Sequence, residues 1–346
     1  MQLALWPSDT AVPPPRKLAK RPAMSRAVPP RPASAAQALE LVLGLEERAS
    51  HYEKNAHTDG TRKSYQRDWD AFERWCAQAG HVAMPAGWET LRLYLTHLAE
   101  LGRRPSTIRH ARKSIGLAHA HAGAPRPDRD ERIRTLERGI ACELGSREVG
   151  VVPLLEHELA RAVATLRHSP RDDRDRALIL LGFSGAFRAA DLAGLTMDSV
   201  KFTPEGMRIF LARSKEDRIG EGSHTDIPRG AQEETCPVKA MRSWLARVGR
   251  PSGPLFRVVH GAQIEHQRIS TRAVARAVQR VTERAGLQGH YAAHSLRSGL
   301  ATSAHAHGHA DREIQAHGRW KDRRSLDRYI DVERIAGRRN VAEGLL

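Results

Sequence analysis

Four residue types that bind anions or transfer protons lie close together near the end of this 346-residue chain. His294 and Arg297 are three residues apart at the start of an expected helix, and therefore occupy neighbouring positions on one face. Trp320 follows in a predicted turn with the sequence HGRW, and Tyr329 is expected on a helix that begins at Ser325. Guanidinium groups bind anionic oxygens, imidazole moves protons, and a phenol is a nucleophile once deprotonated. Each motif alone is common by chance.

A second cluster precedes this one along the chain. Arg188 interrupts an apolar stretch in the sequence GAFRAADLAGL, and an unpaired buried charge is unfavourable. Asp191, three residues later, is the expected partner. Lys215 lies in the charged sequence RSKEDR, in the expected turn of a hairpin between strands near Met207 and Ile227.

Together these segments resemble the tyrosine recombinase (integrase) family, with a spacing close to that of Cre recombinase. GAFRAADLAGL is similar to the family's first box, and RSKEDR to the hairpin that presents its lysine. HSLRSGLATSAHAHGHADREIQAHGRWKDRRSLDRYI is similar to the second and third boxes, and TRKSYQRDWDAFERWC extends the resemblance toward the N-terminus. Three positions depart from the family pattern: Phe187 replaces leucine, Asp191 stands where glutamate is frequent, and Trp320 occupies a position often held by histidine.

The resemblance implies a nucleophile and two phosphate ligands. Tyr329 attacks a phosphodiester and leaves a 3′-phosphotyrosine and a free 5′-hydroxyl, while Arg188 and Arg297 bind the non-bridging oxygens. A guanidinium suits that role because it is always charged and can bind two oxygens at once. Because the phosphotyrosine preserves the bond energy, rejoining needs no ATP, and because the guanidinium groups neutralise the developing charge, no metal ion is needed.

The supporting roles also come from the resemblance. Lys215 is the general acid for the leaving 5′-oxygen, and His294 acts on the proton of the nucleophile or binds the phosphate. Trp320 donates a hydrogen bond to a non-bridging oxygen, since an indole N–H replaces that of histidine. Asp191 orients Arg188 or His294.

Tyr291 is the only rival nucleophile among the five tyrosines. Tyr65 and Tyr94 lie on apolar helical stripes that predict core positions, and Tyr52 lies in a weakly patterned segment. Tyr291 precedes the helix of His294, whereas the family's nucleophile follows the turn of Trp320. Tyr329 is therefore the predicted nucleophile.

The composition points to a polyanionic partner. The formal net charge is +16, and residues 1–50, 51–145 and 146–346 are each net positive. Such a distribution favours several DNA-facing surfaces over one basic tail. Three cysteines without a CxxC motif, and no membrane-length apolar run, predict a soluble cytoplasmic protein associated with the nucleoid. No cofactor is expected. Zinc is not expected at His305, His307 and His309, because alternate residues do not share a helical face.

The expected fold is mainly α, with a small antiparallel β-sheet in the second of two domains. Residues 1–45 form a flexible leader rich in proline and arginine, 46–145 a helical DNA-binding bundle, 146–150 a linker, and 151–346 a mixed α/β catalytic domain. Helical patterns cover 61–78, 88–101, 129–144 and a helix capped by Ser106 in the first domain. In the second they cover 155–167, 174–183, 236–248 and 270–285, with strands at 207–212 and 254–259.

The predicted DNA contacts are basic residues on helical faces. Arg272, Arg276, Arg280 and Arg284 form a ladder at four-residue spacing, in which like charges repel unless an anion binds them. A solvated face is a fair alternative interpretation. The first domain presents similar pairs. The predicted DNA-binding residues are Lys63, Arg67, Arg109, Lys113, Arg272, Arg276 and Arg280.

The resemblance also implies an assembly. The protein is expected to be a monomer when free and a homotetramer on two double-stranded recombination sites. In the tetramer, the tail that contains Val341, Leu345 and Leu346 is expected to dock on a neighbouring subunit. Two alternatives remain at this point. One is a type IB topoisomerase that relaxes supercoils with the same residues, and the other is a non-catalytic DNA-binding protein of the same fold.

Overall fold

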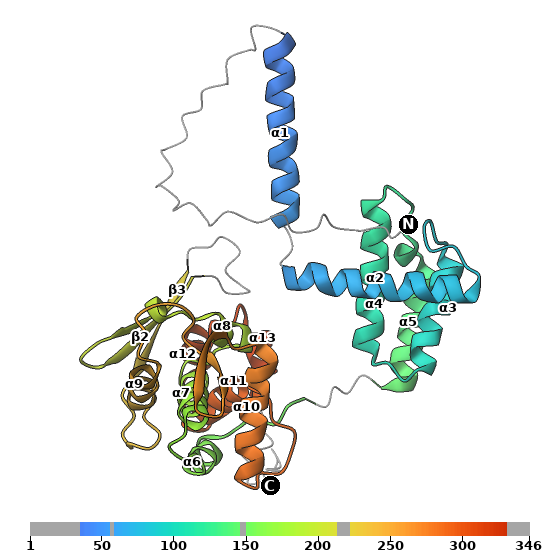
Figure 1. Cartoon of the computed structure of the whole chain (residues 1–346). Coiled ribbons are helices and arrows are strands. Elements are labelled where there is room, and N and C mark those ends of the chain that lie inside the picture. Colours follow the sequence, from blue (N-terminus) through green and yellow to red (C-terminus); the bar gives the residue numbers. More distant parts are fainter. Residues whose placement is uncertain (1–34, 56–58, 146–149, 213–221, 331–346) are drawn as a thin grey trace. The chain divides into compact units, whose positions relative to one another are not determined.

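The chain divides into two compact units, Met1–Glu148 and Val149–Leu346, which are described separately (Figure 1). The computed structural model describes residues 35–55, 59–145, 150–212 and 222–330. Lys215, most of the predicted linker and the predicted docking tail lie outside these ranges. Within them, each helix is too short or too polar to cross a bilayer.

The first unit is helical. The predicted stripe on its second helix is confirmed, because Tyr65, Trp69, Phe72 and Cys76 are all buried. The last three pack with apolar residues of the following helices to form the core of this unit. The helices are α1 (Ala35–Asn55), α2 (Asp59–Ala79), α3 (Trp88–Glu100), α4 (Pro105–His121) and α5 (Glu131–Leu144), with a 3-10 turn at Pro127–Arg129.

Four helix starts in this unit differ from the prediction, and the first of them is α2, which begins at Asp59 rather than at residue 61. Helix α1 begins at Ala35, inside the predicted flexible leader. Ser106 is not the N-cap of α4, because Pro105 is its first residue and the fixed φ of proline suits that position. Helix α5 begins at Glu131, two residues late, because the Asp130 side chain caps it by accepting a hydrogen bond from the Arg132 N–H at 2.9 Å.

The second unit combines helices with two small antiparallel sheets, which confirms the predicted fold class. Its sheets have the strand orders β1-β2-β3 and β4-β5. In the first sheet Ile209 pairs with Thr225. The elements are α6 (Glu156–Ala164), α7 (Pro170–Ser184), α8 (Ala189–Gly194), a 3-10 turn (Met197–Ser199), β1 (Val200–Phe202), β2 (Gly206–Leu211), β3 (Ser223–Pro228), α9 (Pro237–Val248), β4 (Arg257–His260), β5 (Gln263–Arg268), α10 (Thr271–Arg284), α11 (Ala293–Ala306), α12 (Asp311–Gly318) and α13 (Arg323–Asp327).

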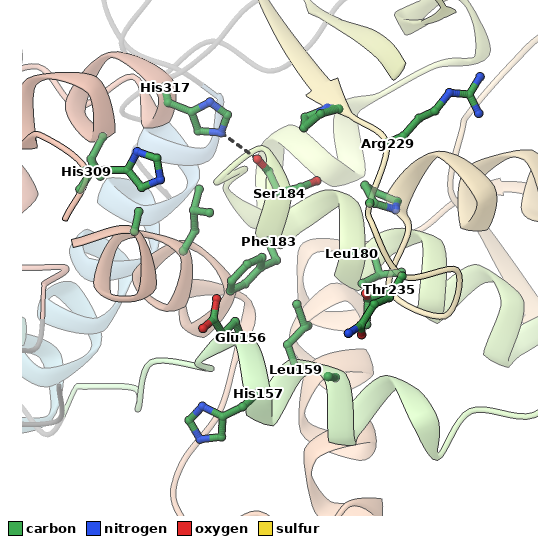
Figure 2. Close-up of a pocket in the computed structure, with 18 of the residues that line it drawn as sticks. Glu156, His157, Leu159, Leu180, Phe183, Ser184, Arg229, Thr235, His309 and His317 are labelled. Carbon is green, nitrogen blue, oxygen red and sulfur yellow. Dashed lines mark hydrogen bonds between the residues drawn. The ribbon is translucent and has the colours of Figure 1, made fainter. Parts of the chain in front are cut away.

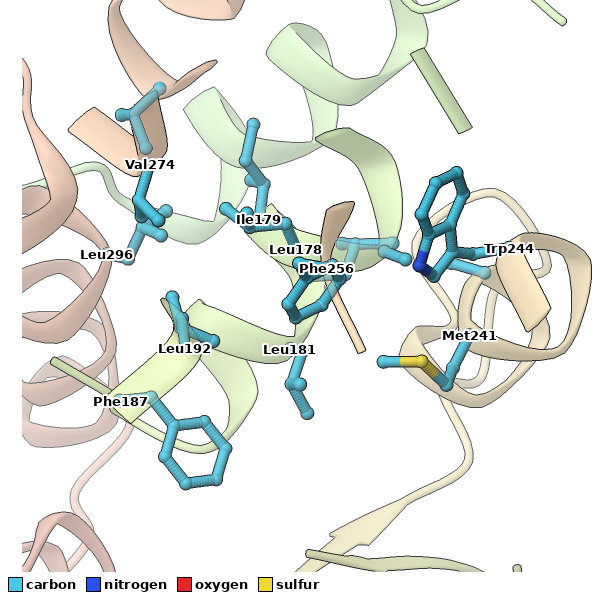
Figure 3. Close-up of a cluster of buried hydrophobic side chains, with 14 of the residues drawn as sticks. Leu178, Ile179, Leu181, Phe187, Leu192, Met241, Trp244, Phe256, Val274 and Leu296 are labelled. Carbon is cyan, nitrogen blue, oxygen red and sulfur yellow. The ribbon is translucent and has the colours of Figure 1, made fainter. Parts of the chain in front are cut away.

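Helix α7 is the central element of this unit. Its run from Ala177 to Leu181 is buried on every side, and the core around it includes Phe187, Leu192 and Leu296 (Figure 3). A helix that is apolar all round belongs in a core. The residues that follow α7 therefore extend from a helix that is held rigidly in the core.

Several boundaries in this unit were predicted wrongly. Helix α7 begins four residues early, since the Ser169 hydroxyl caps it by accepting from the Asp172 N–H at 3.1 Å. Strand β4 starts at Arg257 rather than residue 254, and the short strands β1 and β5 were not predicted. Helix α13 ends at Asp327, so Tyr329 lies in the turn after it and not on a helix.

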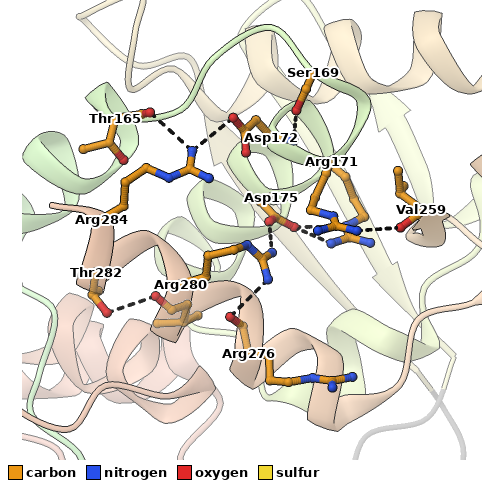
Figure 4. Close-up of polar contacts among 12 residues, drawn as sticks. Thr165, Ser169, Arg171, Asp172, Asp175, Val259, Arg276, Arg280, Thr282 and Arg284 are labelled. Atoms are coloured by element: carbon orange, nitrogen blue, oxygen red, sulfur yellow. Dashed lines mark hydrogen bonds and ion pairs between the residues drawn. The ribbon is translucent and has the colours of Figure 1, made fainter. Parts of the chain in front are cut away.

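Two of the four arginines in the ladder on α10 have carboxylate partners. Arg280 forms an ion pair with the fully buried Asp175 of α7, and Arg284 pairs with Asp172 at 3.1 Å (Figure 4). Arg272 and Arg276 are exposed. The carboxylates of α7 therefore account for the second half of the ladder, and the first half is left as the predicted DNA contact.

This division predicts two different phenotypes. Replacing Arg272 and Arg276 together by alanine is expected to weaken DNA binding and to lower the slope of log K against log salt by about 2, because each phosphate contact contributes about 0.9. Arg280→Ala is expected instead to lower the free energy of unfolding by about 2 kcal/mol, since Asp175 stays buried and keeps, among the described residues, its ion pair with Arg174 alone. Salt titrations of binding and urea unfolding measure the two effects. Equal salt slopes for both variants would contradict the division.

Candidate active site

The turn between α7 and α8 presents Arg188. Ala186 adopts a positive φ of 47°, which turns the chain sharply after the helix. The Asp191 carboxylate accepts a hydrogen bond from the backbone N–H of Arg188 at 3.1 Å. Asp191 therefore holds the main chain from which the Arg188 side chain leaves.

Arg297 is the most deeply placed member of the cluster. It is fully buried on α11, and its Nη1 donates to the carbonyl of Ala186 in the turn before Arg188. Its guanidinium carbon lies 4.0 Å from the centre of the Trp320 ring and 5.4 Å from that of Tyr329. Burial, reinforced by the charge of Arg188, lowers the pKa of Arg297 to about 10, so the group stays charged at neutral pH.

Two aromatic side chains complete the cluster around Tyr329. The Trp320 and Tyr329 ring centres are 5.3 Å apart in an edge-on arrangement, and those of His294 and Tyr329 are 6.1 Å apart. His294 is exposed at the start of α11, whereas Trp320 is buried. The structure thus places Arg297, Trp320 and His294 around the half-buried Tyr329. Arg188 is close enough to Arg297 for their charges to interact, and Asp191 is bonded to the main chain of Arg188. Lys215 lies outside the described residues.

Buried donors in this cluster are available for an anion. Nε and Nη2 of Arg297 and Nε1 of Trp320 have no hydrogen-bond partner among the described residues. Buried N–H groups are normally paired, and an unpaired one is unfavourable by about 1–3 kcal/mol. A phosphate beside Tyr329 would supply acceptors for these donors.

The backbone of Tyr329 is held on both sides. Its N–H donates to the carbonyl of Leu326 at 2.7 Å, and its carbonyl accepts from the hydroxyl of Thr302 at 3.0 Å. Thr302 is fully buried on α11, the helix that also carries His294 and Arg297. Thr302 was not predicted, because a hydroxyl that binds a main-chain carbonyl leaves no pattern in the sequence.

This contact gives a prediction for Thr302. Thr302→Val keeps the shape of the side chain but loses the hydrogen bond to the Tyr329 carbonyl, and we expect cleavage of DNA to slow by about 10-fold through misplacement of the phenol. Thr302→Ser retains the hydroxyl and is the matched control, expected within about 3-fold of the wild type. Single-turnover cleavage rates test both. A serine variant as slow as the valine variant would contradict this role for the hydroxyl.

The rival tyrosine is occupied elsewhere. Tyr291 is buried, and its hydroxyl donates to Oε1 of the buried Glu158 at 3.3 Å. Tyr65 and Tyr94 are core residues of the first unit, as predicted, and burial raises the pKa of Tyr94 to about 12. Tyr329 is the tyrosine that contacts the arginine cluster.

The predicted DNA-binding residues of the first unit lie on two helices that pack together. Lys63 and Arg67 are exposed on α2, and Arg109 and Lys113 are exposed on α4. Lys113 lies 5.8 Å from the centre of the Tyr65 ring, so its stem covers apolar surface while its charge stays outside. The two basic pairs thus belong to neighbouring helices of one unit, as a DNA-facing surface would require.

The three closely spaced histidines pair with separate carboxylates. His305 lies 3.1 Å from Asp311, His307 lies 2.7 Å from Glu156, and His309 lies 3.8 Å from Glu313. In the described part of the chain, no group of three or more potential ligands is arranged to hold a metal ion.

Comparison with known proteins identifies the family of this chain. The model of the phage integrase family matches residues 153–334, which include every described member of the cluster. The chain belongs to this family. It is 33% identical over 287 residues to the integrase/recombinase xerD homolog of Selenomonas ruminantium, over 82% of this chain and 84% of the relative. It is 26% identical over 266 residues to tyrosine recombinase XerD of Pseudomonas putida, over 75% and 82%. This phage integrase family member is thus a site-specific tyrosine recombinase.

Solved structures show the same fold at low identity. The XerH site-specific recombinase bound to its palindromic difH substrate has a TM-score of 0.59 at 14% identity, over 86% of this chain and 81% of that one. A lambda integrase dimer bound to a COC′ core site has a TM-score of 0.55 at 15% identity, over 86% and 96%. The fold of the phage integrase family is therefore shared by this chain.

Proposed function

We propose that this recombinase cleaves and rejoins DNA strands through a 3′-phosphotyrosine intermediate formed on Tyr329, without ATP or a metal ion. The observation that carries the proposal is the packing of Tyr329 against Arg297 and Trp320, because Nε and Nη2 of Arg297 and Nε1 of Trp320 have no hydrogen-bond partner among the described residues. A negatively charged transition state beside the phenol would accept hydrogen bonds from these N–H groups. Preorganised donors of this kind stabilise developing charge strongly.

In the proposed reaction the Tyr329 oxygen attacks phosphorus, and the bond from phosphorus to the 5′-oxygen breaks. The phenol proton passes to His294 or to water, and the leaving oxygen receives a proton from Lys215. Arg188 and Arg297 neutralise the non-bridging oxygens, with Trp320 as a further donor. Rejoining reverses these steps, with a 5′-hydroxyl of the same or another strand as nucleophile. The bond energy is conserved because one phosphoester replaces another.

We infer that the partner is double-stranded DNA and that recombination takes place in a homotetramer. A lambda integrase tetramer bound to a Holliday junction shares the fold, with a TM-score of 0.54 at 14% identity, over 84% of this chain and 77% of that one. The exposed basic pairs on α2 and α4, and Arg272 and Arg276 on α10, supply charge for phosphate contacts.

The predicted docking tail gives a test of this assembly. Deletion of residues 337–346 is expected to impair pairing of two sites by at least about 10-fold while single-site affinity changes by less than about 2-fold, because linked contacts raise the effective concentration of the second site. Gel-shift titrations with one and with two sites measure both quantities. Equal losses in both assays would count against a docking role for the tail.

Topoisomerase activity and non-catalytic binding are the alternatives. Incubation with supercoiled plasmids that carry one or two sites separates them. A recombinase exchanges strands between two sites, a topoisomerase relaxes either plasmid equally, and a binding protein changes neither. Recombinant products from the two-site plasmid alone would support the proposal, and relaxation without exchange would overturn it.

A further inference from the structure

The end of α7 is held by side chains from a distant part of the sequence. Its last carbonyl groups lack intrahelical partners, as at every helix C-terminus. His317 Nε2 lies 2.7 Å from the carbonyl oxygen of Ser184, and the two face each other at the edge of a pocket (Figure 2). Arg319 Nη2 donates to the carbonyl of Gly185 at 2.9 Å, and Arg297 donates to that of Ala186. Three successive carbonyls are therefore bound by three residues of the C-terminal region.

Arg319 makes further contacts that the other two residues do not make. Its guanidinium carbon lies 4.7 Å from the centre of the Phe187 ring, and its Nη1 donates to the hydroxyl of Thr225 on β3. The residue itself adopts a left-handed conformation, with φ of 57°, at the end of α12. That conformation is unfavourable for a residue with a side chain, and here it aims the guanidinium at the α7–α8 turn.

We infer that Arg319 is a positioning residue for Arg188. The inference rests on the proposed function, in which Arg188 binds the scissile phosphate. Arg319 holds the turn from two sides, through the carbonyl of Gly185 and the ring of Phe187, and Arg188 is the next residue along the chain. The aromatic ring at position 187, where the family usually has leucine, gives the guanidinium a face to stack on.

The chemistry of these contacts requires arginine. A planar guanidinium can donate to Gly185 and Thr225 and stack on Phe187 at the same time, whereas a lysine ammonium lacks the planar fork. The charge of Arg319 also contributes to the lowered pKa values of Arg297 and His317, after burial as the main cause. Arg319 thus lies close enough to influence the cluster while its Nη1 and Nη2 groups donate to protein atoms.

A double-mutant cycle on full-length protein tests the inference. Arg319→Met should slow single-turnover cleavage of a nicked suicide substrate by about 30-fold and leave DNA affinity within about 3-fold, because a small displacement of a catalytic group lowers the rate by this order. In the background of Arg188→Lys the same change should slow cleavage by less than about 3-fold, since its effect acts through Arg188. Effects that multiply in full would overturn the inference. Arg161→Met, an exposed arginine on α6, is the matched control and should cleave at the wild-type rate.

Two further variants keep the test decisive if Arg319→Met is poorly folded. Thr225→Val and Phe187→Leu each remove one contact of Arg319, and each should slow cleavage by about 3- to 10-fold while the protein stays folded at the temperature of the assay. Normal cleavage by both would overturn the inference. Wild-type cleavage by Arg188→Lys would instead refute the proposed role of Arg188. Slow cleavage by Arg188→Lys, with normal cleavage by well-folded Arg319→Met, would refute the inference alone.

Discussion

Tyr329→Phe is expected to abolish covalent protein–DNA complexes while leaving DNA binding intact. Phenylalanine keeps the ring that packs against Trp320 and His294 but removes the hydroxyl that attacks phosphorus in the proposed reaction. Loss of a nucleophile lowers a rate by at least about 10⁴-fold, so trapped complexes should fall below detection. Denaturing gels with a suicide substrate measure the covalent product, and gel shifts measure the affinity.

Tyr291→Phe is the matched control for this variant. It removes a buried hydrogen bond to Glu158 and should lower the free energy of unfolding by about 1 kcal/mol, with covalent complexes formed at the normal rate. If Tyr329→Phe still formed covalent complexes, the nucleophile would be wrongly assigned. Loss of complexes in Tyr291→Phe, with normal folding, would point to Tyr291 in its place.

Arg297→Met is expected to separate stability from activity. Cleavage should fall by about 10³-fold, because the variant loses a charged donor to the phosphate. Stability should stay within about 1 kcal/mol of the wild type, since the lost hydrogen bond from Nη1 to the Ala186 carbonyl is offset by relief of the desolvation of a guanidinium whose Nε and Nη2 have no partner in the described structure. Single-turnover cleavage and urea unfolding give the two quantities.

Arg257 is a second buried arginine, and its replacement is expected to affect stability rather than cleavage. It lies on β4, and its guanidinium donates to the carbonyls of Pro254 and Ser252 at 3.0 and 2.7 Å. Arg257→Met should therefore lower the free energy of unfolding by about 2 kcal/mol and leave cleavage unchanged. An Arg297→Met protein that cleaved within 10-fold of the wild type, or that unfolded as readily as Arg257→Met, would contradict the account of Arg297.

The helical stripes and the order of the catalytic boxes were predictable from the sequence because both depend on local spacing. Tyr65, Trp69, Phe72 and Cys76 recur at helical intervals, and burial of one face follows from that period alone. The grouping of Arg188, Arg297 and Tyr329 followed from resemblance to a family. No periodic pattern links residues so far apart in the chain.

Contacts with main-chain atoms could not be predicted. Thr302, Arg319 and Arg297 bind carbonyl oxygens, which every residue possesses, so neither the residue type nor the spacing of the partner marks the contact. The partners of the α10 ladder were missed for a related reason. Asp172 and Asp175 lie at the start of α7, about a hundred residues before Arg280 and Arg284, and only the packing of α7 against α10 brings them together.

Short elements were also beyond prediction. Strands β1 and β5 depend on pairing with neighbours more than on their own composition. The end of α13 at Asp327 lets the chain turn so that the Tyr329 carbonyl reaches Thr302. A helix continued through Tyr329 was the simpler local expectation, and a tertiary contact decided otherwise.

Mass spectrometry of the trapped covalent complex tests the central claim most directly. After digestion with protease and nuclease, a suicide substrate cleaved by the full-length protein should leave one nucleotide linked through its 3′-phosphate to the peptide that contains Tyr329. Attachment at Tyr291 or any other residue, or a link through a 5′-phosphate, would contradict the account.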